Sequence, residues 1–324
     1  MLLLALACGP TDIGPFQRAT LPTGAAVGDS GWVDTAEAAV GWDSAALGDS
    51  GEDTAAGADT AETTPAGVFA CYLGPARDYS LCLPVVDYDA GLFGGDYDYP
   101  DASSGGESYN PPERFLDLSA HSTELEIAPN FALGEYLQEW KGRYGVMQGH
   151  VVDRLQDIRD HIGEPLTVNS GYRNPAYNTS IGGADWSRHM WGDAADIQSS
   201  NYSVEALGTL CEDLGADYVG LYEDGHTHCD WRYAAADTAF YGSVPAGPVP
   251  AETATLVVLG PVLTAPAVGF DEGEPLRRWT AFDASGSVLI TTTGRDFAPP
   301  SGAAWVHVRI GGRVTLVHRT SAPP

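Results

Sequence analysis

The chain has 324 residues, of which 44% are hydrophobic, and its 16 Lys+Arg against 44 Asp+Glu give a formal net charge of −28. Nucleic acid and anionic lipid surfaces are not expected partners, because both need clusters of Lys and Arg that the sequence lacks. There is no run of 18 apolar residues, so no membrane-spanning helix is expected. The length suits one sizeable domain with either a smaller domain or long tails.

The first eight residues form a short apolar run that ends in Cys8. This run resembles the end of a bacterial lipoprotein signal, in which the cysteine carries the lipid, although it is shorter than a usual signal and lacks a positively charged start. We predict that residues 1–8 are a truncated lipoprotein signal and that the protein is exported, with a lipid anchor at Cys8. A chance match is the alternative.

Residues 9–67 consist largely of Asp, Thr, Ala, Gly and Ser and contain ten acidic residues but only one basic residue, Arg18. So few apolar side chains cannot offset the entropy lost on ordering, and like charges extend such a chain. We predict a disordered acidic linker, with calcium binding by its aspartates as the less favoured alternative.

Residues 68–112 are rich in Tyr, Asp and Gly and are expected to form an irregular segment. The segment holds two of the five cysteines, Cys71 and Cys82, and two cysteines this close in an exported protein favour a disulfide. With Cys8 as the anchor, Cys211 and Cys229 remain as a second candidate pair.

The patterns of residues 113–233 mix helices and strands. A helix over 147–162 is predicted by an apolar stripe at helical spacing, and it ends at Gly163; the stripe consists of Val151, Leu155, Ile158 and Ile162. A second helix begins after Ser203 as its N-cap. Strands are predicted at 166–170, 218–222 and 227–231. Because these elements do not alternate regularly, we expect an α+β fold.

After a Pro/Ala/Gly-rich linker at 234–252, residues 253–324 contain short strand-like runs. They are 255–259, 287–292, 305–309 and 313–317. Short strands with turn residues between them are typical of a small β-sandwich-like domain. Its Arg and Trp side chains could bind wall polymers, but packing is the favoured role.

The central domain also holds a pattern typical of metal sites. His189 and Asp196 lie seven residues apart, and His226 and His228 lie two apart, so the last two share one face of a strand, with Asp230 beside them. Imidazole and carboxylate are ligands of catalytic zinc, which takes three protein ligands and keeps one position for water.

The neighbouring cysteine is a weaker candidate ligand. Cys229 points to the opposite face of the same strand, toward the helix that carries Cys211. A disulfide or a core position therefore suits it better than the zinc.

These motifs resemble the zinc D-Ala-D-Ala carboxypeptidases of the M15 peptidases, within the lysostaphin/carboxypeptidase/hedgehog (LAS) metallopeptidase group, which carries His-x6-Asp followed by His-x-His. The resemblance covers about residues 115–233. Further matching positions are Ile127-Ala128-Pro129-Asn130-Phe131, Glu135, Ser170-Gly171-Tyr172-Arg173, Asn178, Gly182-Gly183, Ser187, Gly192 and Ala195-Asp196-Ile197. It implies a hedgehog/D-Ala-D-Ala-peptidase-like fold with a small antiparallel sheet and flanking helices.

Site roles follow from the resemblance as expectations. Three residues match the ligands of Zn²⁺: His189, Asp196 and His228. His226 matches a catalytic histidine or one that supports the metal, Arg173 matches an arginine that binds substrate or stabilises the transition state, and Ser187 matches a serine near the substrate.

The general base stays open. Some members of the family place a Glu three residues before the last zinc ligand, where this chain has Gly225. Glu223, Asp224 and His226 are the nearby candidates, and His226 is favoured.

The resemblance implies a zinc metallopeptidase of the cell envelope or the extracellular space. It would hydrolyse peptidoglycan peptides with a metal-activated water, as a D,D-carboxypeptidase or an endopeptidase. The guanidinium of Arg173 suits a terminal carboxylate. The alternative role for Arg173 is a surface salt bridge without a function in catalysis. One alternative function is a non-catalytic zinc-containing module that binds the cell wall or a partner. Another is a stalked surface protein that acts through its C-terminal β domain.

Overall fold

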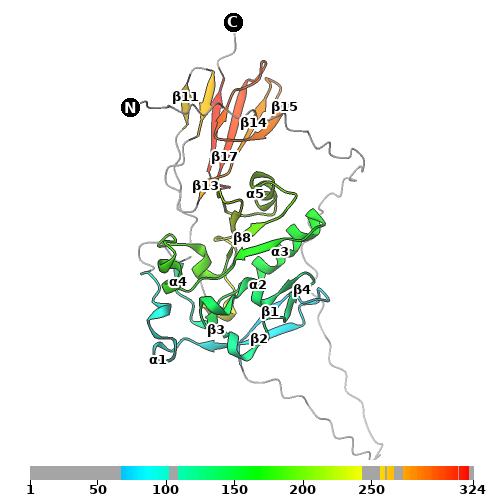
Figure 1. Ribbon diagram of the computed structural model, residues 1–324. Coiled ribbons are helices and arrows are strands. Elements are labelled where there is room, and N and C mark those ends of the chain that lie inside the picture. Colours follow the sequence, from blue (N-terminus) through cyan, green and yellow to red (C-terminus); the bar gives the residue numbers. More distant parts are fainter. Residues whose placement is uncertain are drawn as a thin grey trace, which may run out of the picture. The chain divides into compact units, whose positions relative to one another are not determined.

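The computed structural model describes residues 67–101, 109–242, 256–259, 261–265, 273–312 and 314–320 (Figure 1). The predicted lipoprotein signal and almost all of the predicted acidic linker lie outside these residues, as do residues 243–252 of the predicted linker at 234–252. The linker prediction is wrong for residues 238–241, which form a short helix with buried side chains. Within the described part of the chain, no helix combines the length and the apolar character that a bilayer crossing requires.

The expectation that residues 68–112 are irregular is wrong. The segment contributes the first two strands of a four-stranded antiparallel sheet of order β1-β2-β3-β6, whose strands are Phe69–Tyr72, Leu81–Asp87, Arg114–Asp117 and Tyr144–Gly145. Cys71 and Cys82 are direct partners in this ladder and form a disulfide. A short helix α1 (Ala90–Phe93) and a 3-10 turn (Gly94–Tyr97) follow and bury Phe93 and Tyr97 in the main core.

A second sheet carries the central motifs. Its five strands are antiparallel and have the order β13-β9-β10-β8-β7. In that order they span Glu274–Pro275, Tyr218–Leu221, Thr227–Asp230, Ala194–Gln198 and Thr167–Ser170. The edge strand β13 comes from the part of the chain that the sequence assigns to the C-terminal domain, so the boundary expected near residue 253 does not separate the two sets of strands.

The predicted helices form for the expected reasons. Helix α3 (Gly149–Ile162) buries the predicted apolar stripe and ends at Gly163, whose φ of 68° supplies the left-handed cap. Helix α5 (Val204–Asp213) begins at Ser203, whose hydroxyl accepts a hydrogen bond from the Ala206 N–H. It packs on β9 and β10, and a disulfide joins its Cys211 to Cys229 of β10.

Shorter elements complete the central part. The helices are α2 (Leu133–Tyr136), α4 (Pro175–Ser180) and α6 (Thr238–Tyr241), and a two-stranded ribbon joins β4 (Glu126–Ala128) to β5 (Phe131–Ala132). There are also 3-10 turns at Leu118–Ala120, Glu139–Lys141 and Arg188–Trp191. The mixture of helices with small antiparallel sheets is the expected α+β arrangement.

The C-terminal part is all β. One sheet has the order β11-β12-β16 and spans Val257–Leu259, Val262–Thr264 and Asp296–Phe297. The other has the order β15-β14-β17-β18 and spans Val288–Thr293, Arg277–Phe282, Trp305–Ile310 and Val314–Arg319. A small apolar core of their side chains includes Trp279, Phe297 and Val306. The sequence predicts four of these strands and misses β12, β14 and β16.

Candidate metal centre

Two strands and one turn bring three predicted residues together. Asp196 on β8 lies directly opposite His228 on β10 in the ladder, and His189 comes from the 3-10 turn that precedes β8. His189 Nε2 lies 3.1 Å from Asp196 Oδ1 and 3.1 Å from His228 Nδ1, and the last two atoms lie 3.0 Å apart. All three residues are buried, and together they form a group that could hold a metal ion.

The outer nitrogen of each histidine has an acceptor of its own. His189 Nδ1 lies 2.6 Å from the carbonyl oxygen of Gly171, and His228 Nε2 lies 3.2 Å from Asp230 Oδ2. A carbonyl and an ionised carboxylate only accept hydrogen bonds, so the ring protons are assigned to these outer nitrogens. The inner nitrogens then present lone pairs to each other and to the carboxylate oxygen of Asp196.

Three acceptor atoms that converge without a proton between them repel one another unless a cation lies among them. Zinc ligands at the usual bond lengths and tetrahedral angles lie about 3.3 Å apart, close to the separations found here. The two imidazoles and one carboxylate, with both rings oriented by outer hydrogen bonds, therefore fit a zinc ion and leave one position for water.

The groups around the three residues favour this state. Burial lowers the pKa of His189, and the guanidinium of Arg173 adds to the effect, so the ring is held neutral. Burial opposes ionisation of Asp230, but its pairing with Arg232 holds the pKa well below its usual range. Arg232 Nε donates to Asp230 Oδ1 at 2.8 Å. Asp230 thus remains an acceptor for His228.

Arg173 approaches the group from the side of β7. Its Nη2 pairs with Asp196 Oδ2, and its Nε donates to Ser170 Oγ at 2.9 Å. The side chain is only 11% exposed, so the alternative of a surface salt bridge is wrong. The structure shows Arg173 fixing the carboxylate of Asp196.

Gly171 allows this part of the chain to lie against helix α2. A Cβ at Gly171 would lie 2.4 Å from the carbonyl oxygen of Tyr136, far inside any normal contact. Only glycine fits there, and its carbonyl is the one that orients His189. The match of this glycine to the family pattern therefore has a steric cause.

His226 precedes β10 and lies at the mouth of the group. Its Nε2 is 4.0 Å from Asp196 Oδ1, and its Nδ1 is 2.6 Å from Asp224 Oδ1. The ring stacks on Tyr222, with centroids 4.1 Å apart. Its side chain is 14% exposed, whereas the rings of His189 and His228 are fully buried. His226 is thus the histidine of this group that solvent can reach.

Ser187 is less informative. It is fully buried, and its carbonyl accepts a hydrogen bond from the Met190 N–H at the start of the turn that carries His189. Its hydroxyl has no hydrogen-bond partner among the described residues. Ser187 therefore lies two residues before His189 in the chain, with its hydroxyl buried.

Two neighbours of the site, Arg232 and Lys141, are not predicted by the sequence. The pairing of Arg232 with Asp230 had no sequence signal beyond the spacing of two. Lys141 donates from Nζ to Ser170 Oγ at 2.6 Å, although it lies 29 residues from that serine in the chain. Its one signal in the sequence is that it is the sole lysine.

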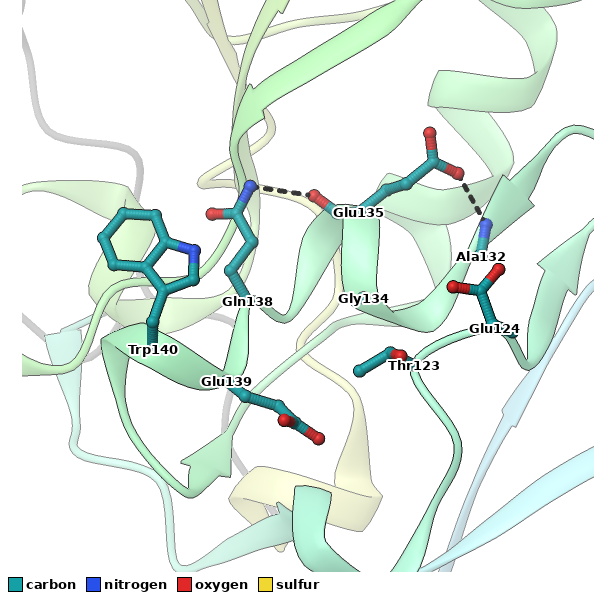
Figure 2. A pocket seen from close by; sticks show the side chains of 8 residues that line it. All are labelled: Thr123, Glu124, Ala132, Gly134, Glu135, Gln138, Glu139 and Trp140. Atoms are coloured by element: carbon teal, nitrogen blue, oxygen red, sulfur yellow. Dashed lines mark hydrogen bonds between the residues drawn. The ribbon is translucent and has the colours of Figure 1, made fainter.

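A groove of about 460 Å³ lies beside α2 and the turn that ends at Lys141 (Figure 2). Its lining consists of Thr123, Glu124, Ala132, Gly134, Glu135, Gln138, Glu139 and Trp140. The Glu135 carboxylate accepts a hydrogen bond from the Ala132 N–H at 2.7 Å, within the groove wall. None of the three converging residues lines this groove, so we do not identify it with the metal centre.

Comparison with known proteins agrees with the geometry. Residues 129–230 match the family model of peptidase M15. Over 101 residues the chain is 36% identical to the zinc D-Ala-D-Ala carboxypeptidase of Streptomyces albus G. The matched segment makes up 29% of this chain and 37% of that relative. The matched region contains the converging His-Asp-His group. Residues 129–230 are therefore similar to a zinc peptidase domain of the M15 type.

Proposed function

We propose that the chain hydrolyses peptides of the bacterial cell wall, as a D-Ala-D-Ala carboxypeptidase or as an endopeptidase that cuts cross-links. The observation that carries the proposal is the convergence of His189, Asp196 and His228 at 3.0 to 3.1 Å with both histidines oriented from outside. The name of the Streptomyces relative supplies the substrate class. An exported location, with a lipid anchor at Cys8, belongs to the same proposal.

In this proposal three residues hold the zinc: His189, Asp196 and His228. Zinc bound there would lower the pKa of a water molecule to about 7 and polarise the scissile carbonyl. Arg173 holds the carboxylate of Asp196 in one orientation, and Asp230 does the same for His228. Such outer contacts fix the tautomer and direction of the ligands before the substrate arrives.

His226 is the proposed proton acceptor. Because Asp224 accepts the Nδ1 proton, Nε2 carries the lone pair, and this nitrogen faces the metal group at 4.0 Å from Asp196. Asp224 has a side chain that is 71% exposed and contacts the ring rather than the buried group, which suits an orienting role. Among the three candidates for the base, this arrangement supports His226.

The alternative of a non-catalytic zinc module would retain the metal group and lose the proton acceptor. A histidine with a free nitrogen beside the three ligands is what catalysis needs and what a purely structural site does not use. This observation favours the peptidase.

The test is incubation of the full chain with purified muropeptides, with and without a zinc chelator, followed by mass spectrometry. Loss of one alanine from a pentapeptide stem indicates a carboxypeptidase, whereas a split dimer indicates an endopeptidase. The matched control is His189→Ala, for which neither product should form. Zinc at about one per chain with no cleavage of any muropeptide would contradict the proposal and favour the binding module.

A further inference from the structure

Lys141 is the only lysine of the chain and lies almost completely inside the protein, 5% exposed. It ends the 3-10 turn Glu139–Lys141, and Gly142 follows with a φ of 143°. A Cβ at Gly142 would lie 2.5 Å from Asn174 Nδ2. The turn is therefore pressed against the segment 170–174, which gives Lys141 a fixed place beside that segment.

The ammonium of Lys141 shares one oxygen with the guanidinium of Arg173. Ser170 Oγ accepts from Lys141 Nζ at 2.6 Å and from Arg173 Nε at 2.9 Å. The ammonium also lies 5.2 Å from the centre of the Trp140 ring and 5.5 Å from that of Tyr177. Aromatic faces hold a cation in place without neutralising it, so two positive charges meet at one hydroxyl.

No carboxylate of the described residues forms an ion pair with Lys141, although the chain has 44 acidic residues. The acidic group that acts on it is Asp196, which already pairs with Arg173 and faces the two histidines. Burial lowers the pKa of Lys141 to about 7, and the charge of Arg173 contributes to the decrease. Because a buried cation without a counterion is costly, a bound anion would favour the protonated form of this amine.

The hydrogen-bond donors of Lys141 also favour binding of an anion. An ammonium has three donors, and Ser170 is the one acceptor that the described residues supply. The hydrogen bonds run from Lys141 through Ser170 and Arg173 to Asp196, so these cations lie on the β7 side of the metal group. An anion from outside would find both charge and unused donors there.

We propose that Lys141, together with Arg173, binds a carboxylate of the peptide substrate and makes the enzyme selective for peptides that carry one next to the bond that is cut. The inference rests on the proposed peptidase function and deepens it. The carboxylate is either the C-terminal α-carboxylate or an acidic side chain near the cleaved bond. Both share one chemistry, and the substrate series below separates them.

The test uses the full, zinc-loaded chain and three peptides that end in D-Ala-D-Ala: the free acid, its C-terminal amide, and the free acid with its acidic side chain converted to an amide. Wild type should prefer peptides with the relevant carboxylate. Lys141→Met should raise KM for them by about ten- to a hundredfold, the value of a charged hydrogen bond, and leave the matching amide unchanged. If wild type cleaves the C-terminal amide less well than the free acid, Lys141 binds the C-terminal carboxylate. If it cleaves the side-chain amide less well, Lys141 binds the acidic side chain.

Two further measurements separate binding from structure. Calorimetric binding of the preferred acid to the metal-free chain should weaken by a similar factor in Lys141→Met. The same variant should have a melting temperature a few degrees above that of wild type, because it removes a buried charge and keeps the apolar stem. The matched control is Arg143→Met, since Arg143 lies two residues away, is 59% exposed and pairs with Asp117. It should leave the preference unchanged.

Each contrary result has a distinct meaning. If wild type cleaves acid and amides equally and Lys141→Met changes none of them, the role of Lys141 is overturned while the peptidase stands. If Lys141→Met lowers the melting temperature and slows acid and amides alike, Lys141 is structural and the inference is also overturned. If zinc-loaded wild type cleaves no wall peptide at all, the proposed function itself fails, and the inference with it.

Discussion

The central five-stranded sheet and the C-terminal four-stranded sheet bury different kinds of side chain. Strands β8 and β10 bury Asp196, His228 and Asp230. Strands β14 and β17 instead bury mainly apolar residues, such as Trp279 and Val308, and one charged side chain, Arg277. Burying an ionisable group lowers stability unless it is paired. The central sheet therefore carries more of this cost than the C-terminal sheet, and its buried ionisable groups converge at one place, which marks it as the place of chemistry.

The largest effect on the central sheet is expected at Gly171, whose backbone carbonyl accepts the hydrogen bond that orients His189. In Gly171→Ala the new Cβ collides with the Tyr136 carbonyl and displaces the carbonyl that orients His189. A shift of about 1 Å can cost about a hundredfold in rate, and we expect a loss of at least that size in kcat/KM together with weaker zinc binding. In Gly95→Ala, the control, the Cβ meets nothing closer than 3.7 Å, and kinetics should match wild type.

The next largest effect is expected at Asp230, which orients His228. Asp230→Asn should lower zinc affinity by about ten- to a hundredfold, as is usual for residues that support a ligand, measured by competition with a chromogenic chelator. Asp193→Asn is the matched control, because Asp193 also forms a buried pair, with Arg188, but accepts no hydrogen bond from a ligand ring. Equal loss of affinity in both variants would mean that the buried pairs act only through stability.

A smaller effect is expected at Asp224, which holds His226 in one tautomer. Asp224→Asn should lower kcat by about tenfold, because general-base catalysis is weakened but not removed, while zinc content stays the same. Steady-state kinetics with a D-Ala-D-Ala peptide would measure this. An unchanged kcat would indicate that His226 needs no orienting carboxylate or is not the base.

Glu212 gives a prediction for stability alone. Burial raises its pKa to about 7. The charges of Arg309 and Arg278 lower the pKa, and the charge of Asp213 raises it. Between the ordinary value of 4.5 and about 7, the folded state keeps a proton that the unfolded state has released, so stability falls as pH rises through this window. Relative to Glu212→Gln, the free energy of unfolding of wild type should fall by roughly 3 kcal/mol over that range. Denaturation at pH 5 and pH 7.5 measures it, and parallel profiles would contradict it.

The smallest effect is expected in the C-terminal sheet. Trp305 on β17 is 39% exposed, and Trp305→Ala should leave zinc binding and peptide cleavage unchanged within a factor of about two, with a small loss of stability. Both can be read from the assays above. A large loss of cleavage of soluble peptides would show that this sheet takes part in the chemistry and would remove the contrast between the two sheets.

Local patterns allowed much of the central domain to be predicted. Helical spacing and capping located α3 and α5, and the spacing of two between His226 and His228 put both near Asp196. These features depend on residues close together in the chain. The grouping of His189, Asp196 and His228 is predicted by motifs whose order resembles that of a known family.

The pairing of strands that lie far apart in the chain could not be predicted from the sequence. Nothing local indicates that β13 joins β9 or that β2 joins β3, because such contacts depend on the register between distant segments. The contact of Lys141 with Ser170 has the same origin. A sequence pattern shows which side chains can bind a metal, but the outer hydrogen bonds that orient them depend on the folded chain.

The most direct test of the central claim is a zinc titration of the full chain and of His189→Ala, Asp196→Ala and His228→Ala, with the bound metal measured by mass spectrometry under native conditions. We expect one zinc per chain for wild type and none for each variant at the same free zinc, with all variants folded by circular dichroism. Zinc retained at one per chain by any of the folded variants would contradict the assignment of these three residues.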